Sequence, residues 1–317
     1  MEQKQHNELK KMVVCVTAAT VWTEPNAPRY IDQLALMNPV NLEGWLSSIT
    51  TEESLKLCTN NLVQSQVLYG TDVYLLKEQE EWAHVLIPTQ PSKKDKRGYP
   101  GWIPLRQLTA SMLDSVDSNE IAQVTAEKST LHTSVANLRK KNGAGCMEIS
   151  FLTRFPVTKQ TDEYTEVVTP HGQRFIKTED VRIFQKEEEL HTVNGNDLLE
   201  TGKMFLDLPY LWGGMTSYGY DCSGFVYSVY RSYGITLPRD ASDQVKQGTP
   251  ITRENLQVGD LLFFAYEKGK GAVHHVGMYA GNDLMIHSPK TGKTVEIIPL
   301  TNTKYEEELI GGRRYIS

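Results

Sequence analysis

The sequence predicts a multidomain protein with two all-β units at its N-terminal end and one α+β domain at its C-terminal end. Its 317 residues are enough for two or three domains. A pattern of short strands occurs twice in the first 185 residues or so. From about residue 195 the spacing of apolar residues becomes helical, and strand-like segments follow. Helices followed by strands are typical of an α+β domain.

Two similar strand repeats indicate two small β-barrels. Each copy has a strand, a charged turn, an aromatic residue, a strand ending in proline, and then glycine, an aromatic–Ile pair and a short tail. The copies are "VYLLKEQEEWAHVLIP" (73–88) with "GYPGWIPLRQL" (98–108), and "FPVTKQTDEYTEVVTP" (155–170) with "HGQRFIKTEDV" (171–181). Repeated short strands at this spacing favour small barrels. We expect barrel 1 over residues 1–110 and barrel 2 over residues 111–185.

An insertion interrupts the first unit between about residues 27 and 66. "PRYIDQLALM" and "LEGWLSSI" have apolar residues at helical spacing, and "TTEESLKL" opens with Thr and then Glu, like the start of a helix. We therefore expect barrel 1 to carry a helical excursion.

The C-terminal domain is expected over residues 195–317, after a solvated linker at 186–194 within the charged run "QKEEELHTVNGN". "NDLLETGKMFLDL" has the apolar spacing of a helix. The strand-like segments that follow are "DLLFFAY" (260–266), "AVHHVGMYA" (272–280), "DLMIHSP" (283–289) and "TVEIIPL" (294–300). This order predicts helices first and an antiparallel sheet after them.

Composition argues against several kinds of partner. Lys+Arg is 33 and Asp+Glu is 39, and no basic face stands out, so nucleic acid is not expected. No apolar run is long enough to cross a bilayer. The first residues lack the long apolar core and small-residue cleavage site of a secretory signal. We expect a cytoplasmic monomer, with a secreted or wall-associated protein as the alternative if a signal peptide is missing from this chain.

The four cysteines are far apart, and only one has neighbours that suggest chemistry. No C-x-x-C pair occurs, so we expect no metal site, no disulfide framework and no cofactor. Cys222 lies in "YGYDCSGF" (218–225), directly where an apolar helical pattern begins. Asp221 is placed as an N-cap, which puts Cys222 in the first turn of a helix. There the helix dipole and the free N–H groups favour a thiolate, and hence a nucleophile.

A cysteine nucleophile needs a base, and the base needs an orienting group. His275 and His287 lie about equally far from the turn "AGND" (280–283), so a hairpin would make them near cross-strand neighbours. One ring nitrogen of His275 could then bind His287 while the other faces Cys222. His274 points to the opposite face of its strand, and strand alternation alone does not choose between His274 and His275.

Three motifs resemble the NlpC-type cysteine peptidases, which have a papain-like fold and cleave bacterial cell-wall peptides. They are "PYLWGG" (209–214), "DCSGFVYSVY" and "HHVGMYAGNDLMIHSP", in family order. The resemblance covers residues 195–317, and the strand repeats resemble the bacterial SH3-like barrel. The resemblance to the NlpC-type peptidases implies that Cys222 is the nucleophile, that His275 is the base and that His287 is the third polar residue.

The same resemblance implies further site residues. Tyr210 matches a family tyrosine whose hydroxyl helps to hold the oxyanion, together with a backbone N–H at the helix start. Asp221 and Ser223 match residues that line the substrate pocket.

The order of two SH3-like barrels before an NlpC-type domain resembles the γ-D-glutamyl-L-diamino-acid endopeptidases of the YkfC type. In that type the first barrel closes one end of the site, so that only a peptide with a free N-terminal L-Ala fits. The resemblance implies that Asp240 and Tyr99 bind the substrate amine. Gln64 and Gln66 stand where an acid facing the amine is expected, and Ala241 stands where relatives can carry a hydroxyl.

The implied substrates are small murein peptides, L-Ala-γ-D-Glu followed by a diamino acid, cut through a thioester without a cofactor. One alternative is a secreted hydrolase that acts on intact wall peptides and uses the barrels as anchors. Another is a wall-binding module with a catalytically dead peptidase domain. The charged run "KKDKRG" (93–98) is expected to be a solvated loop.

Overall fold

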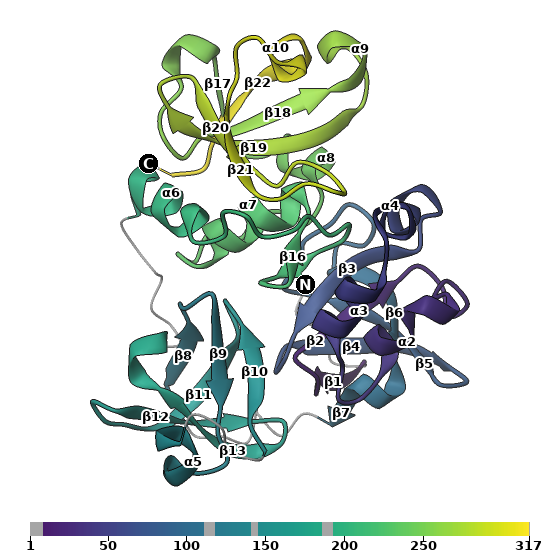
Figure 1. The fold of residues 1–317 in the computed structure, drawn as a ribbon, viewed down its shortest axis with the longest axis vertical. Coiled ribbons are helices and arrows are strands. Elements are labelled where there is room, and N and C mark those ends of the chain that lie inside the picture. Colours follow the sequence, from purple (N-terminus) through teal and green to yellow (C-terminus); the bar gives the residue numbers. More distant parts are fainter. Residues whose placement is uncertain (1–8, 111–117, 141–144, 186–192, 317) are drawn as a thin grey trace. The chain divides into compact units, whose positions relative to one another are not determined.

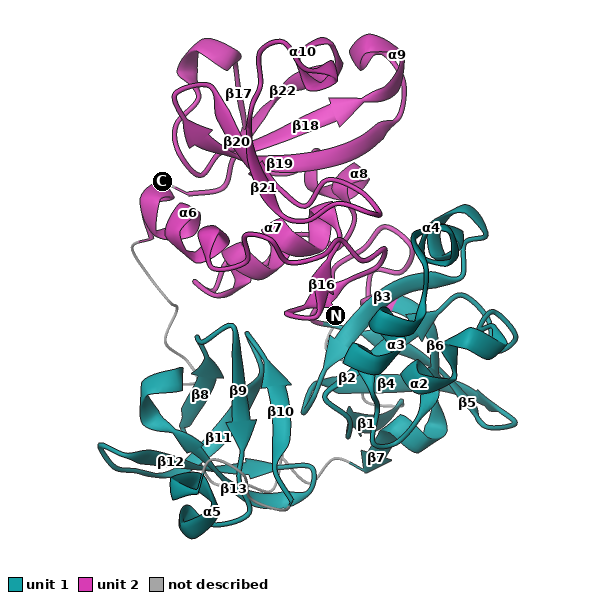
Figure 2. Cartoon of the chain, in the orientation of Figure 1, with its two compact units in different colours: residues 1–88, 100–189 teal, residues 89–99, 190–317 magenta. Residues whose placement is uncertain are grey.

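The computed structural model describes residues 9–110, 118–140, 145–185 and 193–316 (Figure 1). The chain divides into two compact units (Figure 2). Unit 1 consists of residues 1–88 and 100–189, and unit 2 consists of residues 89–99 and 190–317. The segment 89–99 therefore follows a strand of unit 1 but belongs to unit 2. The predicted linker at 186–194 lies mostly outside the described residues.

The first half of unit 1 is a seven-stranded sheet with the order β3-β2-β6-β5-β4-β1-β7. Its strands are β1 (Lys10–Val14), β2 (Ala18–Trp22), β3 (Val63–Leu68), β4 (Asp72–Gln79), β5 (Trp82–Ile87), β6 (Tyr99–Pro104) and β7 (Leu108–Ala110). Among the described residues, β3 and β7 are the end strands of this sheet. The strand-rich N-terminal region is thus confirmed.

Helices occupy the predicted insertion between β2 and β3. They are η1 (Tyr30–Asp32), α2 (Gln33–Leu36), α3 (Leu42–Ser48) and α4 (Thr51–Thr59). The side chain of Thr50 accepts a hydrogen bond from the N–H of Glu53 and so caps α4, as its Thr–Glu start predicts. Trp45 is fully buried, and its indole N–H donates to the buried carboxylate of Asp32 over 2.9 Å. Arg29 forms an ion pair with the same carboxylate, and this pairing offsets the cost of burying the negative charge of Asp32.

The second half of unit 1 is a five-stranded sheet with the order β13-β12-β11-β8-β14, accompanied by the strand pair β10-β9. Its elements are β8 (Glu120–Val124), β9 (Lys128–Leu131), α5 (Val135–Arg139), β10 (Met147–Ser150), β11 (Arg154–Gln160), β12 (Tyr164–Thr169), β13 (Gly172–Lys177) and β14 (Val181–Gln185). Tyr69 of the first half joins this core, where its ring packs edge-on against Phe155. Its hydroxyl donates to Thr169 over 3.0 Å. The two halves of unit 1 therefore share buried residues.

Unit 2 is an α+β domain, as predicted. Its six-stranded antiparallel sheet has the order β17-β22-β18-β19-β20-β21. The strands are β17 (Thr249–Ile251), β18 (Leu261–Ala265), β19 (Val273–Gly281), β20 (Leu284–His287), β21 (Glu296–Pro299) and β22 (Leu309–Arg314). The other elements are α6 (Gly195–Lys203), β15 (Met215–Thr216), β16 (Gly219–Tyr220), α7 (Cys222–Arg231), α8 (Ala241–Gln244), η5 (Arg253–Asn255), α9 (Tyr266–Gly269) and α10 (Lys304–Glu308).

The apolar stripe of α7 fixes the position of its first residue. Phe225, Val226 and Val229 are all fully buried, as their helical spacing predicts. Figure 1 shows α6 and α7 lying side by side along the sheet of unit 2.

None of the helices in the described part of the chain combines the length and apolar character needed to cross a membrane.

Candidate active site

The two histidines predicted to act together are joined by a hydrogen bond. His275 Nε2 lies 2.7 Å from His287 Nδ1, and both side chains are buried. The turn that joins β19 to β20 has positive φ at Asn282 and Asp283, which asparagine and aspartate tolerate better than most residues. The register pairs Met278 with Ile286, which places the histidines diagonally across the two strands. This bond leaves Nδ1 of His275 as the nitrogen for another partner.

Burial keeps this histidine pair uncharged. It lowers the pKa of His275 well below its ordinary value, and the neighbouring His287 adds to this effect. Burial also lowers the pKa of His287 to about 3, with a smaller contribution from Lys304. Both rings are therefore neutral near pH 7, and one of them donates the proton of the bond between them.

His274 lies apart from this pair. Its ring stacks on Tyr266 with the ring centres 4.1 Å apart, and its Nε2 lies 3.2 Å from the carboxylate of Glu308. The structure therefore pairs His275, and not His274, with His287.

Cys222 is the first residue of α7, as predicted. Asp221 is the N-cap, and its carboxylate accepts a hydrogen bond from the N–H of Gly224 over 2.6 Å. Gly224 is required here because a Cβ would lie 2.1 Å from the carbonyl oxygen of Gly214. A hydrogen bond from the backbone of Val276, the residue after His275, reaches the thiol of Cys222. Cys222 at the start of α7 thus lies against β19, next to the strand position of His275.

Surrounding groups shift the pKa of the Cys222 thiol upwards, against the lowering expected from the helix start. Burial, and to a lesser extent the neighbouring carboxylate of Asp221, raise the pKa of the Cys222 thiol to about 12. These two effects outweigh the helix start, from which a lowered pKa was expected. The raised pKa of Cys222 and the lowered pKa values of His275 and His287 favour a neutral thiol and neutral imidazoles near pH 7.

Asp221 and Ser223 are held by an arginine that the sequence analysis did not include. Arg239 is 1% exposed, and its Nη2 lies 2.7 Å from Asp221 Oδ2. Its Nη1 lies 3.2 Å from Asp221 Oδ1 and 3.0 Å from Ser223 Oγ. Asp221 is thus both a helix cap and one half of a buried, two-pronged ion pair.

Tyr99 and Asp240 meet, as the resemblance implies. The hydroxyl of Tyr99 donates to the carboxylate of Asp240 over 3.1 Å. The segment 89–99 that carries Tyr99 is tied to unit 2 by backbone bonds, including one of 2.9 Å from Arg239 N–H to the carbonyl oxygen of Pro91. Asp240 directly follows Arg239, the residue that pairs with Asp221, and Tyr99 is joined to Asp240.

Tyr210 is anchored through its backbone. Its N–H donates to the carbonyl oxygen of Lys293 over 2.9 Å, and an isolated bridge pairs it with Tyr220. Its side chain is partly buried. Its role at the oxyanion remains a prediction.

Gln64 and Gln66 belong to unit 1, where the amide of Gln64 donates to Thr23 and to Asn61.

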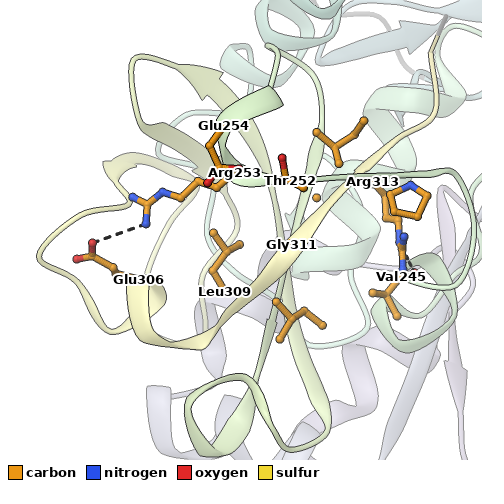
Figure 3. Close-up of a pocket in the computed structure, with 12 residues that line it drawn as sticks. Val245, Thr252, Arg253, Glu254, Glu306, Leu309, Gly311 and Arg313 are labelled. Carbon is orange, nitrogen blue, oxygen red and sulfur yellow. Dashed lines mark hydrogen bonds and ion pairs between the residues drawn. The ribbon is translucent and has the colours of Figure 1, made fainter.

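A separate pocket of ≈ 580 Å³ opens on another part of unit 2 (Figure 3). It is lined mainly by the region around β17, η5 and β22, including Arg253, Glu306 and Arg313. None of the predicted site residues lines it. Among the described residues, no cluster of His, Cys, Asp and Glu suited to a metal ion is present.

Comparisons with known proteins agree with this geometry. The NlpC/P60 family model matches residues 207–314, and the model of the YKFC SH3b2 domain matches residues 124–184. The γ-D-glutamyl-L-lysine dipeptidyl-peptidase of Bacillus subtilis (strain 168) is 43% identical over 96% of this chain and 98% of its own length. The chain belongs to the NlpC/P60 family.

Two further matches, one to a curated protein and one to a solved structure, span nearly the whole chain. The protein of the same name from Bacillus cereus is 40% identical over 96% of this chain and 91% of its own length. The crystal structure of an NlpC/P60 family protein from Bacillus cereus has a TM-score of 0.92 at 39% identity and covers 97% of this chain and 100% of that one. The predicted family and the enzyme class, a cysteine peptidase, are confirmed.

Besides Arg239, two residues near this site were not predicted from the sequence. Tyr305 of α10 packs on His275 and His287, with ring centres 5.3 Å and 5.2 Å apart. Lys94 has its Nζ 2.5 Å from the hydroxyl oxygen of Tyr99 and 3.9 Å from Asp240 Oδ2. Lys94 is exposed, as the prediction of a solvated loop at residues 93–98 requires, but its ammonium contacts Tyr99 and Asp240.

Proposed function

We propose that this protein is a cysteine endopeptidase that hydrolyses the γ-D-glutamyl-L-diamino-acid bond of murein peptides. The relatives named γ-D-glutamyl-L-lysine dipeptidyl-peptidase make L-Lys the first diamino acid to test. One observation carries the catalytic part of the proposal. The thiol of Cys222 accepts a hydrogen bond from the backbone of Val276, which directly follows His275 of the buried His275–His287 pair.

In the first step His275 takes the thiol proton of Cys222 as the sulfur attacks the γ-D-glutamyl carbonyl carbon. The new S–C bond pushes one C=O electron pair onto oxygen, where Tyr210 and a backbone N–H at the start of α7 are the proposed donors. The intermediate collapses, the C–N bond breaks and the protonated His275 gives its proton to the leaving amine. A thioester remains on the enzyme.

Water completes the reaction. His275 removes a proton from a water molecule while the oxygen of that water attacks the thioester carbonyl carbon. The bond between the sulfur of Cys222 and this carbon then breaks. The proton returns to sulfur. The products are L-Ala-γ-D-Glu and a peptide that begins with the diamino acid.

The substrate amine is assigned to Asp240 and Tyr99. A carboxylate with a hydroxyl beside it is a suitable partner for an ammonium group. Peptides with a free N-terminal L-Ala would then be preferred over the acylated peptides of the intact wall. A cytoplasmic monomer that recycles small murein peptides fits this preference.

The domain limits belong to the same proposal. We place SH3-like barrels at 1–110 and 111–185, a linker at 186–194 and the peptidase domain at 195–317. The match of the SH3b2 model to residues 124–184 supports the second barrel. Residues 89–99 of the first barrel would supply Tyr99 to the peptidase domain.

Two substrates test the function. One is L-Ala-γ-D-Glu-L-Lys and the other is the same peptide with its alanine amine acetylated, with release of lysine followed by mass spectrometry. Cleavage of the free-amine peptide alone, lost in Cys222→Ala, is the expected result. Equal cleavage of both peptides would favour the secreted wall hydrolase. Failure to cut either, together with an unreactive Cys222, would favour the dead wall-binding module.

A further inference from the structure

We propose that Glu296 is a positioning residue that fixes the tautomer of His287 and thereby frees the proton-accepting nitrogen of His275. The inference rests on the proposed function, because it concerns how the proton of Cys222 is removed.

The strand register places Glu296 beside His287. These two residues are paired across β20 and β21, so their side chains leave the same face of the sheet. Glu296 Oε1 lies 3.6 Å from His287 Nε2. The His287 side chain is 0% exposed, whereas that of Glu296 is 39% exposed. A glutamate at the solvent edge therefore reaches towards a fully buried ring nitrogen.

That ring nitrogen needs a partner. Within the described residues, His287 Nε2 is buried and makes no hydrogen bond. A buried polar atom that is left without a partner destabilises the folded state. The separation from Glu296 is slightly longer than a direct hydrogen bond. A small rotation of the Glu296 carboxylate would close this gap to a direct hydrogen bond.

The charge of Glu296 selects one tautomer. A neutral imidazole carries one N–H and one acceptor nitrogen, and an ionised carboxylate can only accept. Glu296 therefore favours the form of His287 with its proton on Nε2. Nδ1 of His287 then accepts from Nε2–H of His275, 2.7 Å away. His275 is left with an unprotonated Nδ1, which is the nitrogen able to take the thiol proton.

The opposite tautomer would block the reaction. With its proton on Nδ1, His287 would donate to His275 Nε2, and His275 would carry its own proton on Nδ1. That form cannot accept a proton from Cys222. A wrong tautomer of a catalytic histidine is known to be costly even where the geometry is intact.

The other groups around the pair do not supply this selection. Lys304 and Tyr305 lie near it on α10, and His274 lies next to His275 on β19. Cys222 of α7 is close to Tyr305. None of these is a carboxylate. The nearby Glu308 lies 3.2 Å from His274 instead.

The test compares Glu296→Ala, Glu296→Gln and Glu296→Asp with Glu200→Ala. Glu200 is an exposed glutamate on α6 that pairs with Lys203, so it is a matched control. The first readout is the rate of Cys222 alkylation by iodoacetamide from pH 5 to pH 9. The second is kcat and KM for L-Ala-γ-D-Glu-L-Lys.

We expect Glu296→Ala and Glu296→Gln to lower the alkylation rate near pH 7 and kcat by about tenfold, with KM unchanged. Glu296→Asp should keep more of the alkylation rate and of kcat than these two variants. Glu200→Ala should match the wild type in both measurements. Wild-type alkylation rates across the pH range in Glu296→Ala and Glu296→Gln would overturn the proposal. So would a fall in kcat without a fall in alkylation.

Alkylation requires no substrate, so this arm still decides the role of Glu296 if the wild type does not cut the peptide. If Glu296→Ala unfolds, the ring nitrogens of the ¹⁵N-histidine-labelled wild type provide the answer by NMR. His287, assigned by the loss of its signals in His287→Asn, should carry its proton on Nε2 at pH 7. A proton on Nδ1 would overturn the proposal.

Discussion

The ammonium nitrogen of Lys94 lies 2.5 Å from the hydroxyl oxygen of Tyr99 and 4.1 Å from the centre of the same ring. It also lies 3.9 Å from the carboxylate of Asp240. Under the proposed function, a substrate ammonium would need this hydroxyl and this carboxylate. A lysine of the enzyme therefore competes with the substrate for the group assigned to bind the amine.

Replacing Lys94 by alanine should tighten binding of the free-amine peptide. A hydrogen bond to a charged group contributes about 1.5–3 kcal/mol, so its release to the substrate would lower KM by roughly tenfold. Because this binding is equal in the ground and transition states, kcat should change little. Steady-state kinetics with L-Ala-γ-D-Glu-L-Lys measure both values. The exposed neighbour change Lys96→Ala serves as the control. A raised KM in Lys94→Ala would mean that Lys94 orients Tyr99 for the substrate.

Removing Arg239 should destabilise unit 2 strongly. Asp221 is 7% exposed, and Arg239→Ala would leave its carboxylate buried without its ion-pair partner. Breaking a buried pair in this way costs about 3–5 kcal/mol. Urea denaturation followed by circular dichroism measures the change. In contrast, Arg139→Ala removes an exposed pair with Glu163 and should leave the midpoint unchanged. Equal midpoints for Arg239→Ala and the wild type would show that Asp221 is stabilised by other groups.

Local rules in the sequence could predict Cys222 and His287, whereas the choice of His275 over His274 needed the family resemblance. A helix start positions the cysteine, and a short hairpin brings the histidines together. Lys94 and Tyr305 could not be found this way. Each reaches the site from a segment distant in sequence, and a charged run such as "KKDKRG" is usually solvated. Residue spacing also cannot show how far burial raises the pKa of a thiol, because burial depends on packing by the whole unit.

The ion pair of Arg239 with Asp221 could not be predicted from the sequence either, because it also depends on how unit 2 packs. In sequence, Arg239 stands next to Asp240, which makes a local pair the simpler expectation. In the structure it turns to Asp221, a residue on another element. Likewise, short apolar runs predict that strands exist, but not the order in which six of them assemble in unit 2.

Adding a methyl group at Gly277 should disturb the histidine pair. A Cβ there would lie 2.3 Å from Met285 Sδ and 3.2 Å from His287 Cβ, so these side chains would have to move. A displacement of about 1 Å at a catalytic group can cost about 10²-fold in rate. We expect Gly277→Ala to lower kcat on that order. The control is Gly202→Ala on α6, where the nearest side-chain atom would be 3.3 Å away. Full activity in Gly277→Ala would show that His287 can shift without loss.

The neutral histidine pair should make unit 2 less stable in mild acid. The pKa of His287 is lowered to about 3 by burial, whereas an unfolded histidine titrates near about 6.5. Between these values the unfolded chain binds more protons than the folded one, so the free energy of unfolding falls as pH falls. The contribution is complete above about pH 6.5 and is lost progressively towards pH 3. Urea denaturation at pH 7 and pH 5 should give a lower midpoint at pH 5.

The comparison with His287→Asn isolates this effect, because asparagine does not titrate and should reduce the difference between the two pH values. Activity gives a second check. Only neutral His275 accepts the thiol proton, and burial lowers its pKa, so kcat/KM should hold down to a pH below about 6.5. With the pKa of Cys222 raised to about 12, the alkylation rate should not titrate near the ordinary thiol value. A midpoint near about pH 8.5 in alkylation would instead mean that the thiol is solvated and ionises as a free cysteine does.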